Sequence, residues 1–213
     1  MLMINEMRKF GAPGSGNIFV QPVDSHDMEL MDSETEYVKE ISGRSDFCIL
    51  AVPVSDWNSD LTPWKAAPVF GKQGFGDGAS QTLKTLLDNT NPESRCFICG
   101  YSLAGLFALW TAYRTDAFAG SVAVSPSVWY PDWISYAESN TVQVPAIYLS
   151  LGDREDRARN PVMASVGDAI RRQHEICISA GINTTLEWNP GNHFADSDRR
   201  LAKGISWMLR QMC

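Results

Sequence analysis

Short apolar runs alternate with helix-like segments along almost the whole chain of 213 residues. The apolar runs lie at 17–23, 46–54, 95–101, 118–125, 146–151 and 184–188. Helical patterns lie at 28–41, 79–87, 103–113, 162–179 and 201–212. Strands that are continuously apolar and alternate with helices predict a parallel sheet joined by right-handed crossovers. We therefore expect one α/β domain over residues 1–213, a three-layer sandwich with a mainly parallel sheet of about six strands and helices on both faces.

The chain is acidic, with a formal net charge of −7. Nucleic acid and anionic lipid would be repelled at long range, so neither is an expected partner. The basic pairs Arg171 with Arg172 and Arg199 with Arg200 are expected on solvated helix faces. Residues 1–16 lack the apolar stretch of a signal peptide, and no segment has the length and hydropathy of a membrane span. We expect a cytoplasmic protein.

The five cysteines are scattered and odd in number. Cys96 and Cys99 form a CxxC, but they fall in an expected strand, where positions three apart face opposite sides of the sheet. A redox or metal-binding pair would need a turn or a helix start. We therefore expect buried, reduced thiols. Because the histidines and cysteines are not clustered at ligand spacing, we expect no metal and no cofactor.

Ligands of open parallel sheets bind beyond the carboxyl ends of the strands, and one such loop holds Gly100–Gly105 (GYSLAG). This segment resembles the nucleophile elbow of α/β-hydrolases, G-x-S-x-G. The turn requires small residues two positions before and after the serine, and Gly100 and Ala104 satisfy that requirement. The resemblance makes Ser102 the nucleophile. At the start of the following helix, the amide of Leu103 is positioned to stabilise an oxyanion.

A serine nucleophile needs a base, and the chain has three histidines. His193 follows the last expected strand, which is where the catalytic histidine of this fold falls in the order serine, acid, histidine. His174 lies within a helix among charged residues and is expected at the surface. His26 follows the first strand and can border the site, but it precedes the serine.

The acid of a triad is expected in the loop after the fifth strand, which reads LGDREDR from position 151. In this fold the acid commonly follows a glycine by three positions, which selects Glu155, with Asp153 second and Asp156 third. Its role is to hold the imidazole in the correct tautomer. The same loop can instead be a solvated charge run paired with Arg154 and Arg157. A serine–histidine pair without an acid is a further alternative.

The second oxyanion donor usually comes from the loop after the first parallel strand. That loop begins with Asp24, and we expect the amide of Asp24 or of its neighbour to serve. The sequence lacks an HGG signature there. The segment 55–78, rich in Gly, Pro and Trp, is too long for a simple connection and is expected to be a functional loop.

Several segments together resemble one esterase branch of the α/β-hydrolases, the branch that contains siderophore (enterochelin-type) esterases and esterase D-like enzymes. The matching segments are GYSLAGLFAL at 100–109, SPSVWY at 125–130, DWNSDLTPW at 56–64, LGDRE at 151–155 and GNHF at 191–194. Only about sixteen residues precede Asn17, so we expect the chain to lack the antiparallel strands that open many relatives and to carry no large lid.

The resemblance implies a serine esterase that acts on a small-molecule carboxylic ester through an acyl-enzyme. Trp57 and Trp129 follow strand ends, and each is either part of the acyl or alcohol pocket or a packing residue. Thioesterase, peptidase and acyltransferase activities would use the same residues. A binding module that keeps the fold without the chemistry is the alternative from another class. The oligomeric state stays open.

Overall fold

The computed structural model describes residues 7–69, 71–91 and 93–211. One sheet of seven strands runs through it in the order β1-β3-β2-β4-β5-β6-β7. The strands are β1 (Arg8–Gly11), β2 (Asn17–Val23), β3 (Cys48–Pro53), β4 (Arg95–Tyr101), β5 (Ser121–Val124), β6 (Ala146–Gly152) and β7 (Asn183–Asn189). All neighbours pair in parallel except β1, which is antiparallel to β3. The expected mainly parallel sheet is confirmed.

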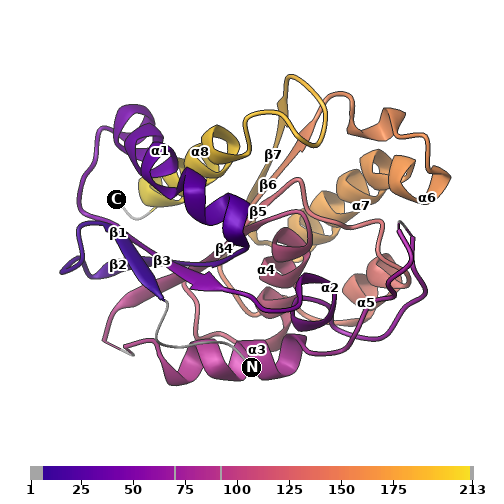
Figure 1. Cartoon of the computed structure of the whole chain (residues 1–213), viewed down its shortest axis with the longest axis horizontal. Helices are drawn as coiled ribbons and strands as arrows, with labels where there is room; N and C mark the ends of the chain where they lie inside the picture. Colours follow the sequence, from indigo (N-terminus) through magenta and orange to yellow (C-terminus); the bar gives the residue numbers. More distant parts are fainter. Residues whose placement is uncertain (1–6, 70, 92, 212–213) are drawn as a thin grey trace.

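Helices cover both faces of this sheet, as expected. They are α1 (Ser25–Ser42), α2 (Trp57–Asp60), α3 (Ala79–Asp88), α4 (Leu103–Arg114), α5 (Trp133–Ser139), α6 (Pro161–Ala164), α7 (Val166–Ser179) and α8 (Ser197–Arg210), with a short 3₁₀ turn η2 (Glu155–Arg157). Figure 1 shows α1 and α8 side by side, apart from α3, α4, α5 and α7. The described residues include no large lid domain.

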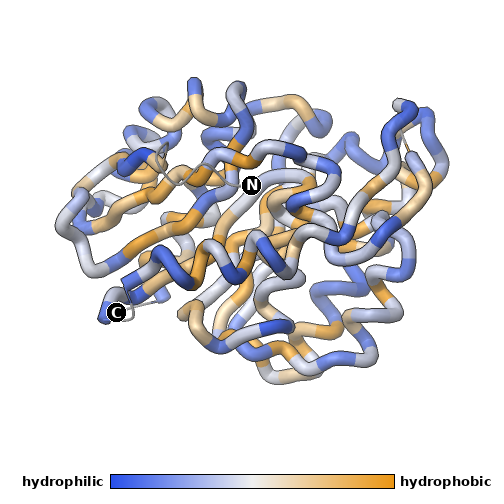
Figure 2. Tube along the Cα trace, turned by 60° about the horizontal axis from the view of Figure 1, so that its bottom comes forward, coloured by the Kyte–Doolittle hydropathy of each residue, from blue (hydrophilic) through white to orange (hydrophobic). Residues whose placement is uncertain are grey.

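Two hydrophobic clusters fill the spaces between the sheet and its helices. One lies under α3, α4, α5 and α7, and the other lies under α1 and α8. Hydrophobic residues follow the strands in the interior, whereas hydrophilic residues mark the outer turns of the helices (Figure 2). Cys96 belongs to the first cluster and Cys99 to the second, so this pair faces opposite sides of β4 as predicted. Both thiols are buried and free.

Three sequence expectations need correction. The antiparallel strand that we expected to be missing is present as β1, whose residue Phe10 pairs with Ile49 of β3. The single helix expected over 162–179 is two helices, because Asn160 caps α6 and a new helix begins at Val166. The expected loop 55–78 contains the helix α2 and a β-bridge between Ala66 and Phe75.

Some expectations concern residues outside the described part of the chain. Met212, the expected end of the last helix, and the fifth cysteine, Cys213, lie there, as do residues 1–6 of the segment judged to lack a signal peptide. Within the described residues, no helix has the length and apolar character needed to cross a membrane.

Candidate active site

Ser102 occupies a strained turn between β4 and α4. Its φ is +58° and its ψ is −120°, a conformation that costs energy for any residue with a side chain. A Cβ at position 100 would lie 2.4 Å from the backbone of Ala104, and one at position 105 would lie 3.0 Å from the carbonyl oxygen of Val124. The methyl group of Ala104, which departs from the usual glycine, fits because Gly100 has no side chain. The local sequence therefore forms the sharp strand-to-helix turn that its pattern predicts.

The loop after β7 carries His193 to this turn. The Nε2 atom of His193 lies 3.0 Å from Ser102 Oγ, within hydrogen-bond distance. The hydroxyl of Tyr101 donates a hydrogen bond of 2.7 Å to the backbone carbonyl of His193, and the two rings are 5.3 Å apart. Tyr101 is the last residue of β4 and directly precedes Ser102, so this hydrogen bond connects the histidine loop to the turn that carries the serine.

The carboxylate of Glu155 lies on the other side of the imidazole. Its Oε2 atom is 2.7 Å from His193 Nδ1, while Oε1 accepts hydrogen bonds of 2.7 Å from the Ser125 hydroxyl and from the Gly152 amide. Burial alone would raise the pKa of Glu155, but the hydrogen bonds from His193, Ser125 and the Gly152 amide, together with the electrostatic interaction with His193, outweigh burial and lower the pKa below its ordinary value. The side chain is therefore held as a carboxylate.

Parallel pairing explains why residues from four loops meet here. The pairing of β4 with β5 sets Tyr101 beside Val124, and the pairing of β6 with β7 sets Gly152 beside Asn189. The residues that follow these strand ends therefore share one edge of the sheet. Ser125, directly after β5, has a φ of +44° and supports the acid. Two residues later, the amide of Ser127 donates to the carbonyl of Ser102 at 3.0 Å.

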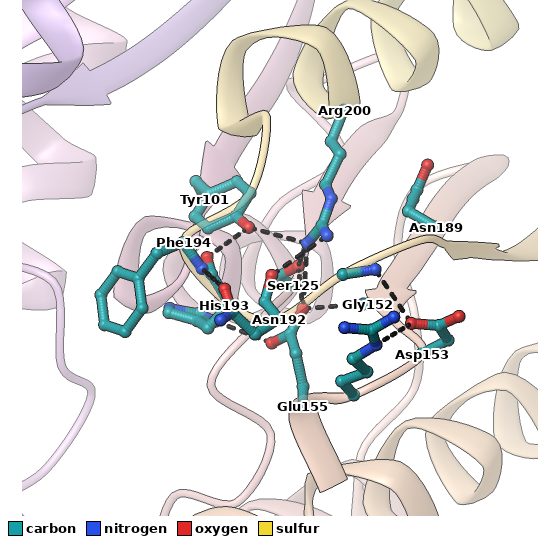
Figure 3. Close-up of polar contacts among 12 residues, drawn as sticks. Tyr101, Ser125, Gly152, Asp153, Glu155, Asn189, Asn192, His193, Phe194 and Arg200 are labelled. Atoms are coloured by element: carbon teal, nitrogen blue, oxygen red, sulfur yellow. Dashed lines mark hydrogen bonds and ion pairs between the residues drawn. The ribbon is translucent and has the colours of Figure 1, made fainter. Parts of the chain in front are cut away.

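The two alternative acids of this loop lie elsewhere. Asp153 is exposed, and its Oδ1 atom accepts a hydrogen bond of 2.9 Å from the Gly191 amide. In Figure 3 its carboxylate lies apart from His193. Asp156 is exposed and lies against Gly167 at the start of α7. Glu155 is thus the one carboxylate of the three that contacts the imidazole. The charged residues around it are exposed, and Asp153 approaches Arg154 at 3.9 Å, so the alternative of a solvated charge run describes the loop around Glu155 but not Glu155 itself.

Sequence reasoning missed Arg200. We expected this residue on a solvated helix face, but its side chain is 2% exposed and reaches from α8 into the site (Figure 3). It donates hydrogen bonds to Glu155 Oε1 at 3.2 Å and to the Tyr101 hydroxyl at 3.1 Å. It also donates to the carbonyls of Pro190 and Asn192, at 2.9 and 3.1 Å. Arg200, Gly204 and Met208 are spaced four residues apart and therefore share the buried face of α8. That helical spacing was the sequence signal that could have predicted the burial of Arg200.

Two backbone amides near Ser102 are free to receive an oxyanion. Leu103 is the first residue of α4, so its amide has no partner within the helix. Asp24 caps α1 by accepting a hydrogen bond from the Asp27 amide on its side chain, and its own amide remains unused. Neither amide donates a hydrogen bond to any other described residue. Asp24 borders the same cleft as Ser102.

Three neighbouring cavities open along this edge of the sheet. The serine cleft, about 240 Å³, is lined by Ser102 and His193 together with Asp24 and Trp57. The Trp57 cavity, about 730 Å³, shares Asp24 and Trp57 with the cleft and continues between the ends of β2 and β3. The Trp129 cavity, about 490 Å³, shares His193 with the cleft. Each tryptophan singled out in the sequence therefore lines a cavity beside the serine.

The other two histidines take no part in this contact chain. His26 borders the serine cleft from α1, as its position after the first strand allowed. His174 lies within α7, where partial burial lowers its pKa. Among the described residues, no three His, Cys, Asp or Glu side chains are grouped as a metal site requires.

Comparisons with known proteins concern the fold. No protein-family model and no curated protein matches the sequence. The siderophore hydrolase EstA from Aspergillus nidulans is similar in structure, with a TM-score of 0.72 at 19% identity over 95% of this chain and 86% of that one. An IroE-like serine hydrolase from Shewanella oneidensis has a TM-score of 0.73 at 16% identity, over 96% of this chain and 75% of that one.

The enterobactin esterase FES from Shigella flexneri is also similar, with a TM-score of 0.67 at 15% identity. The alignment covers 97% of this chain but 56% of that one, so this chain spans little more than half of it. At such identities the likeness concerns architecture. The chain has the α/β-hydrolase fold, and the resemblance to siderophore esterases seen in its sequence is confirmed at that level.

Proposed function

We propose that this chain is a serine esterase that hydrolyses a small-molecule carboxylic ester. Ser102 is the nucleophile, His193 the general base and Glu155 the acid that orients it. The observation that carries the proposal is the unbroken contact chain from Ser102 Oγ to His193 Nε2 at 3.0 Å and from His193 Nδ1 to Glu155 Oε2 at 2.7 Å. Nucleophile, base and orienting group within hydrogen-bond reach are the signature of an activated serine.

The reaction follows from these contacts. Ser102 Oγ bonds to the ester carbonyl carbon while its proton passes to His193 Nε2. The carbonyl oxygen becomes an oxyanion, which the amides of Leu103 and Asp24 stabilise. The carbon–oxygen bond to the alcohol then breaks, and His193 gives its proton to the leaving oxygen. Water attacks the acyl-enzyme with His193 again as base, which releases the carboxylic acid and restores Ser102.

Glu155 supports both proton transfers. An ionised carboxylate beside Nδ1 keeps the proton on that nitrogen and leaves Nε2 free to accept one from serine. It also stabilises the imidazolium that forms after the transfer. The lowered pKa of Glu155 supports this role, because the carboxylate stays charged throughout the neutral pH range.

We assign the acyl portion of the ester to the Trp57 cavity. Asp24 lines both this cavity and the serine cleft, so the cavity begins at the proposed oxyanion donor. Its walls include Val23, Met28 and Val54, which suit an aliphatic acyl chain. Trp57 lies at the junction of the cleft and the cavity.

The test is fluorophosphonate labelling with mass mapping, combined with hydrolysis of short p-nitrophenyl esters. We expect the label on Ser102 and loss of both labelling and hydrolysis in Ser102→Ala. The matched control is Ser197→Ala, which removes another serine of the same cleft and should behave like the wild type. If folded wild-type protein neither labels nor cleaves any ester, the chain is better described as a binding module, and the catalytic assignments fail.

A further inference from the structure

The Trp129 cavity combines an apolar wall with a rim of positive charge. Its apolar residues are Trp129, Ala158, Met163, Val166 and Phe194, and its arginines are Arg154, Arg157 and Arg159. The arginines come from one short stretch after β6, where η2 turns the chain. All three are exposed. Such a concentration of positive charge stands out in a chain with a formal net charge of −7.

These arginines have few partners of their own. Arg154 approaches Asp153 at 3.9 Å, the outer limit of an ion pair. The side chains of Arg157 and Arg159 make no ion pair or hydrogen bond with any residue that the structure describes. Three guanidinium groups on one rim repel one another, so binding an anion there is favourable.

Among the described residues, Arg154 has the nearby carboxylate of Asp153, but no carboxylate pairs with Arg157 or Arg159. Glu155 is the acidic residue among those that line the cavity, and its two oxygens are already bound by His193, Ser125, Gly152 and Arg200. Asp156, the other acid of η2, lies against the start of α7 and does not line the cavity. The cavity therefore presents the guanidinium groups of Arg157 and Arg159, which have no carboxylate partner among the described residues, beside the proposed catalytic histidine.

The Trp129 cavity lies on the side where the leaving alcohol departs. His193 must deliver a proton to the leaving oxygen, so the alcohol portion of the ester is next to His193 during the reaction. His193 lines both the serine cleft and the Trp129 cavity, whereas Asp24, the proposed oxyanion donor, lines the cleft and the Trp57 cavity. The two portions of the ester are therefore assigned to different cavities, the acyl portion to the Trp57 cavity and the alcohol portion to the Trp129 cavity.

This inference rests on the proposed function and specifies its substrate: we propose that the ester carries a carboxylate on its alcohol portion, bound by Arg157 and Arg159. A planar guanidinium binds a carboxylate through two parallel hydrogen bonds, which gives orientation as well as affinity. Trp129, Met163 and Phe194 provide apolar surface for an aromatic or short aliphatic body between the ester oxygen and the carboxylate.

The test compares 4-acetoxybenzoate with its neutral analogue 4-acetoxybenzamide, each kcat/KM being normalised to the rate of alkaline hydrolysis of that ester. We expect the wild type to prefer the carboxylate by about tenfold, the effect of one good charged contact. In the double variant Arg157→Gln/Arg159→Gln the preference should vanish, while the amide is cleaved within about twofold of wild type. Salt at high concentration should narrow the wild-type preference.

The matched control is Arg95→Gln/Arg210→Gln, which should retain the preference. Arg95 is the first residue of β4 and Arg210 the last of α8, so both charges lie at the amino ends of the strands, away from the site. A wild type that cleaves both substrates equally overturns the inference, as does a double variant that loses both activities in parallel. The inference is also overturned if the enzyme prefers a carboxylate only on the acyl portion, that is, if it prefers 4-nitrophenyl adipate to 4-nitrophenyl hexanoate but does not distinguish the two acetoxy esters. If fluorophosphonate labelling and cleavage of the neutral ester persist in those cases, the proposed esterase function still stands. If the wild type shows neither labelling nor cleavage of any ester, the proposed function and this inference are both rejected.

Discussion

Arg200 Nη1 lies 3.2 Å from Glu155 Oε1, the carboxylate oxygen that is not in contact with His193. The two side chains are 2% and 4% exposed, so this ion pair is buried. Arg200 also donates hydrogen bonds to the carbonyls of Pro190 and Asn192, which precede His193 in the loop after β7. One guanidinium thus fixes both the acid and the loop that carries the base. This makes Arg200 a positioning residue for the proposed triad.

Replacement of Arg200 should lower kcat more than it changes KM. Arg200→Lys keeps the charge but loses the forked geometry, and a misplaced histidine loop should reduce kcat by about 10²-fold. Arg200→Met leaves Glu155 as an uncompensated buried charge, which should cost about 3–5 kcal/mol of unfolding free energy. The measurements are kcat per fluorophosphonate-labelled site and a urea unfolding curve.

The neighbouring Arg199→Lys is the control for Arg200, because Arg199 is exposed on the same helix. A purely structural role for Arg200 would lower the fraction of folded protein but leave kcat per labelled site unchanged. That result would contradict the assignment of a positioning role.

The three acids of the loop after β6 should differ sharply in their effect on activity. Glu155→Gln removes the charge beside His193 and should lower kcat by about 10³- to 10⁴-fold. Asp153→Asn keeps an oxygen that can accept the hydrogen bond from the Gly191 amide, so kcat should fall by no more than a few-fold. Asp156→Asn should match the wild type. The measurement is kcat for one short p-nitrophenyl ester in each variant. An equal loss of kcat in the Asp153 and Glu155 variants would contradict the assignment of Glu155 as the acid.

The elbow could be predicted because it depends on neighbours in the sequence. The strain at Ser102 and the close approach of Gly100 to Ala104 arise within five residues, which a local pattern records. His193 was predictable for a similar reason, since the loop after the last strand holds a single histidine. Choosing among the acids after β6 needed the family resemblance, because three carboxylates within four positions satisfy the same local pattern.

Features that depend on contacts between distant parts of the chain could not be predicted from a local sequence pattern. Arg200 is buried because Tyr101, Ser125 and Glu155, which lie at or after the ends of three different strands, converge on its guanidinium. β1 has four residues and no clear alternation, and it becomes a strand by pairing with the free edge of β3. The arginines at the rim of the Trp129 cavity are neighbours in the sequence, but the apolar wall beside them comes from distant residues such as Trp129 and Phe194.

Trp57 should control which acyl chains are accepted. Its side chain lines both the serine cleft and the Trp57 cavity, so the indole lies where an acyl chain would pass. Trp57→Ala should lower kcat/KM for acetyl esters by about tenfold through lost contact, and it should shift the optimum toward longer chains. A series of p-nitrophenyl esters from acetate to octanoate measures this. Trp188→Ala, at an exposed tryptophan of β7, is the control; an unchanged chain-length profile in Trp57→Ala would contradict the acyl assignment.

Glu34 should make the fold less stable as pH rises. This residue of α1 is buried beneath the sheet, where Gln21 donates one hydrogen bond of 3.2 Å to Oε2 and Oε1 has no partner among the described residues. Burial raises its pKa well above the ordinary 4.5, and the charge of Asp27 raises it further. Between the two pKa values the folded state binds a proton that the unfolded state has released, so the free energy of unfolding falls as pH increases above about 4.5.

Glu34→Gln should therefore stabilise the protein at pH 8 and have little effect at pH 4. A neutral amide in place of a buried carboxyl should gain about 1–3 kcal/mol at the higher pH, which corresponds to a rise in Tm of several degrees. Thermal unfolding at pH 4, 6 and 8 measures this, with the exposed Glu40→Gln on the same helix as control. Asp27, whose pKa burial raises to about 6, interacts with Glu34, so the comparison is made in an Asp27→Asn background, which removes that second titration. A difference that does not change with pH would show that Glu34 is ionised in the folded protein.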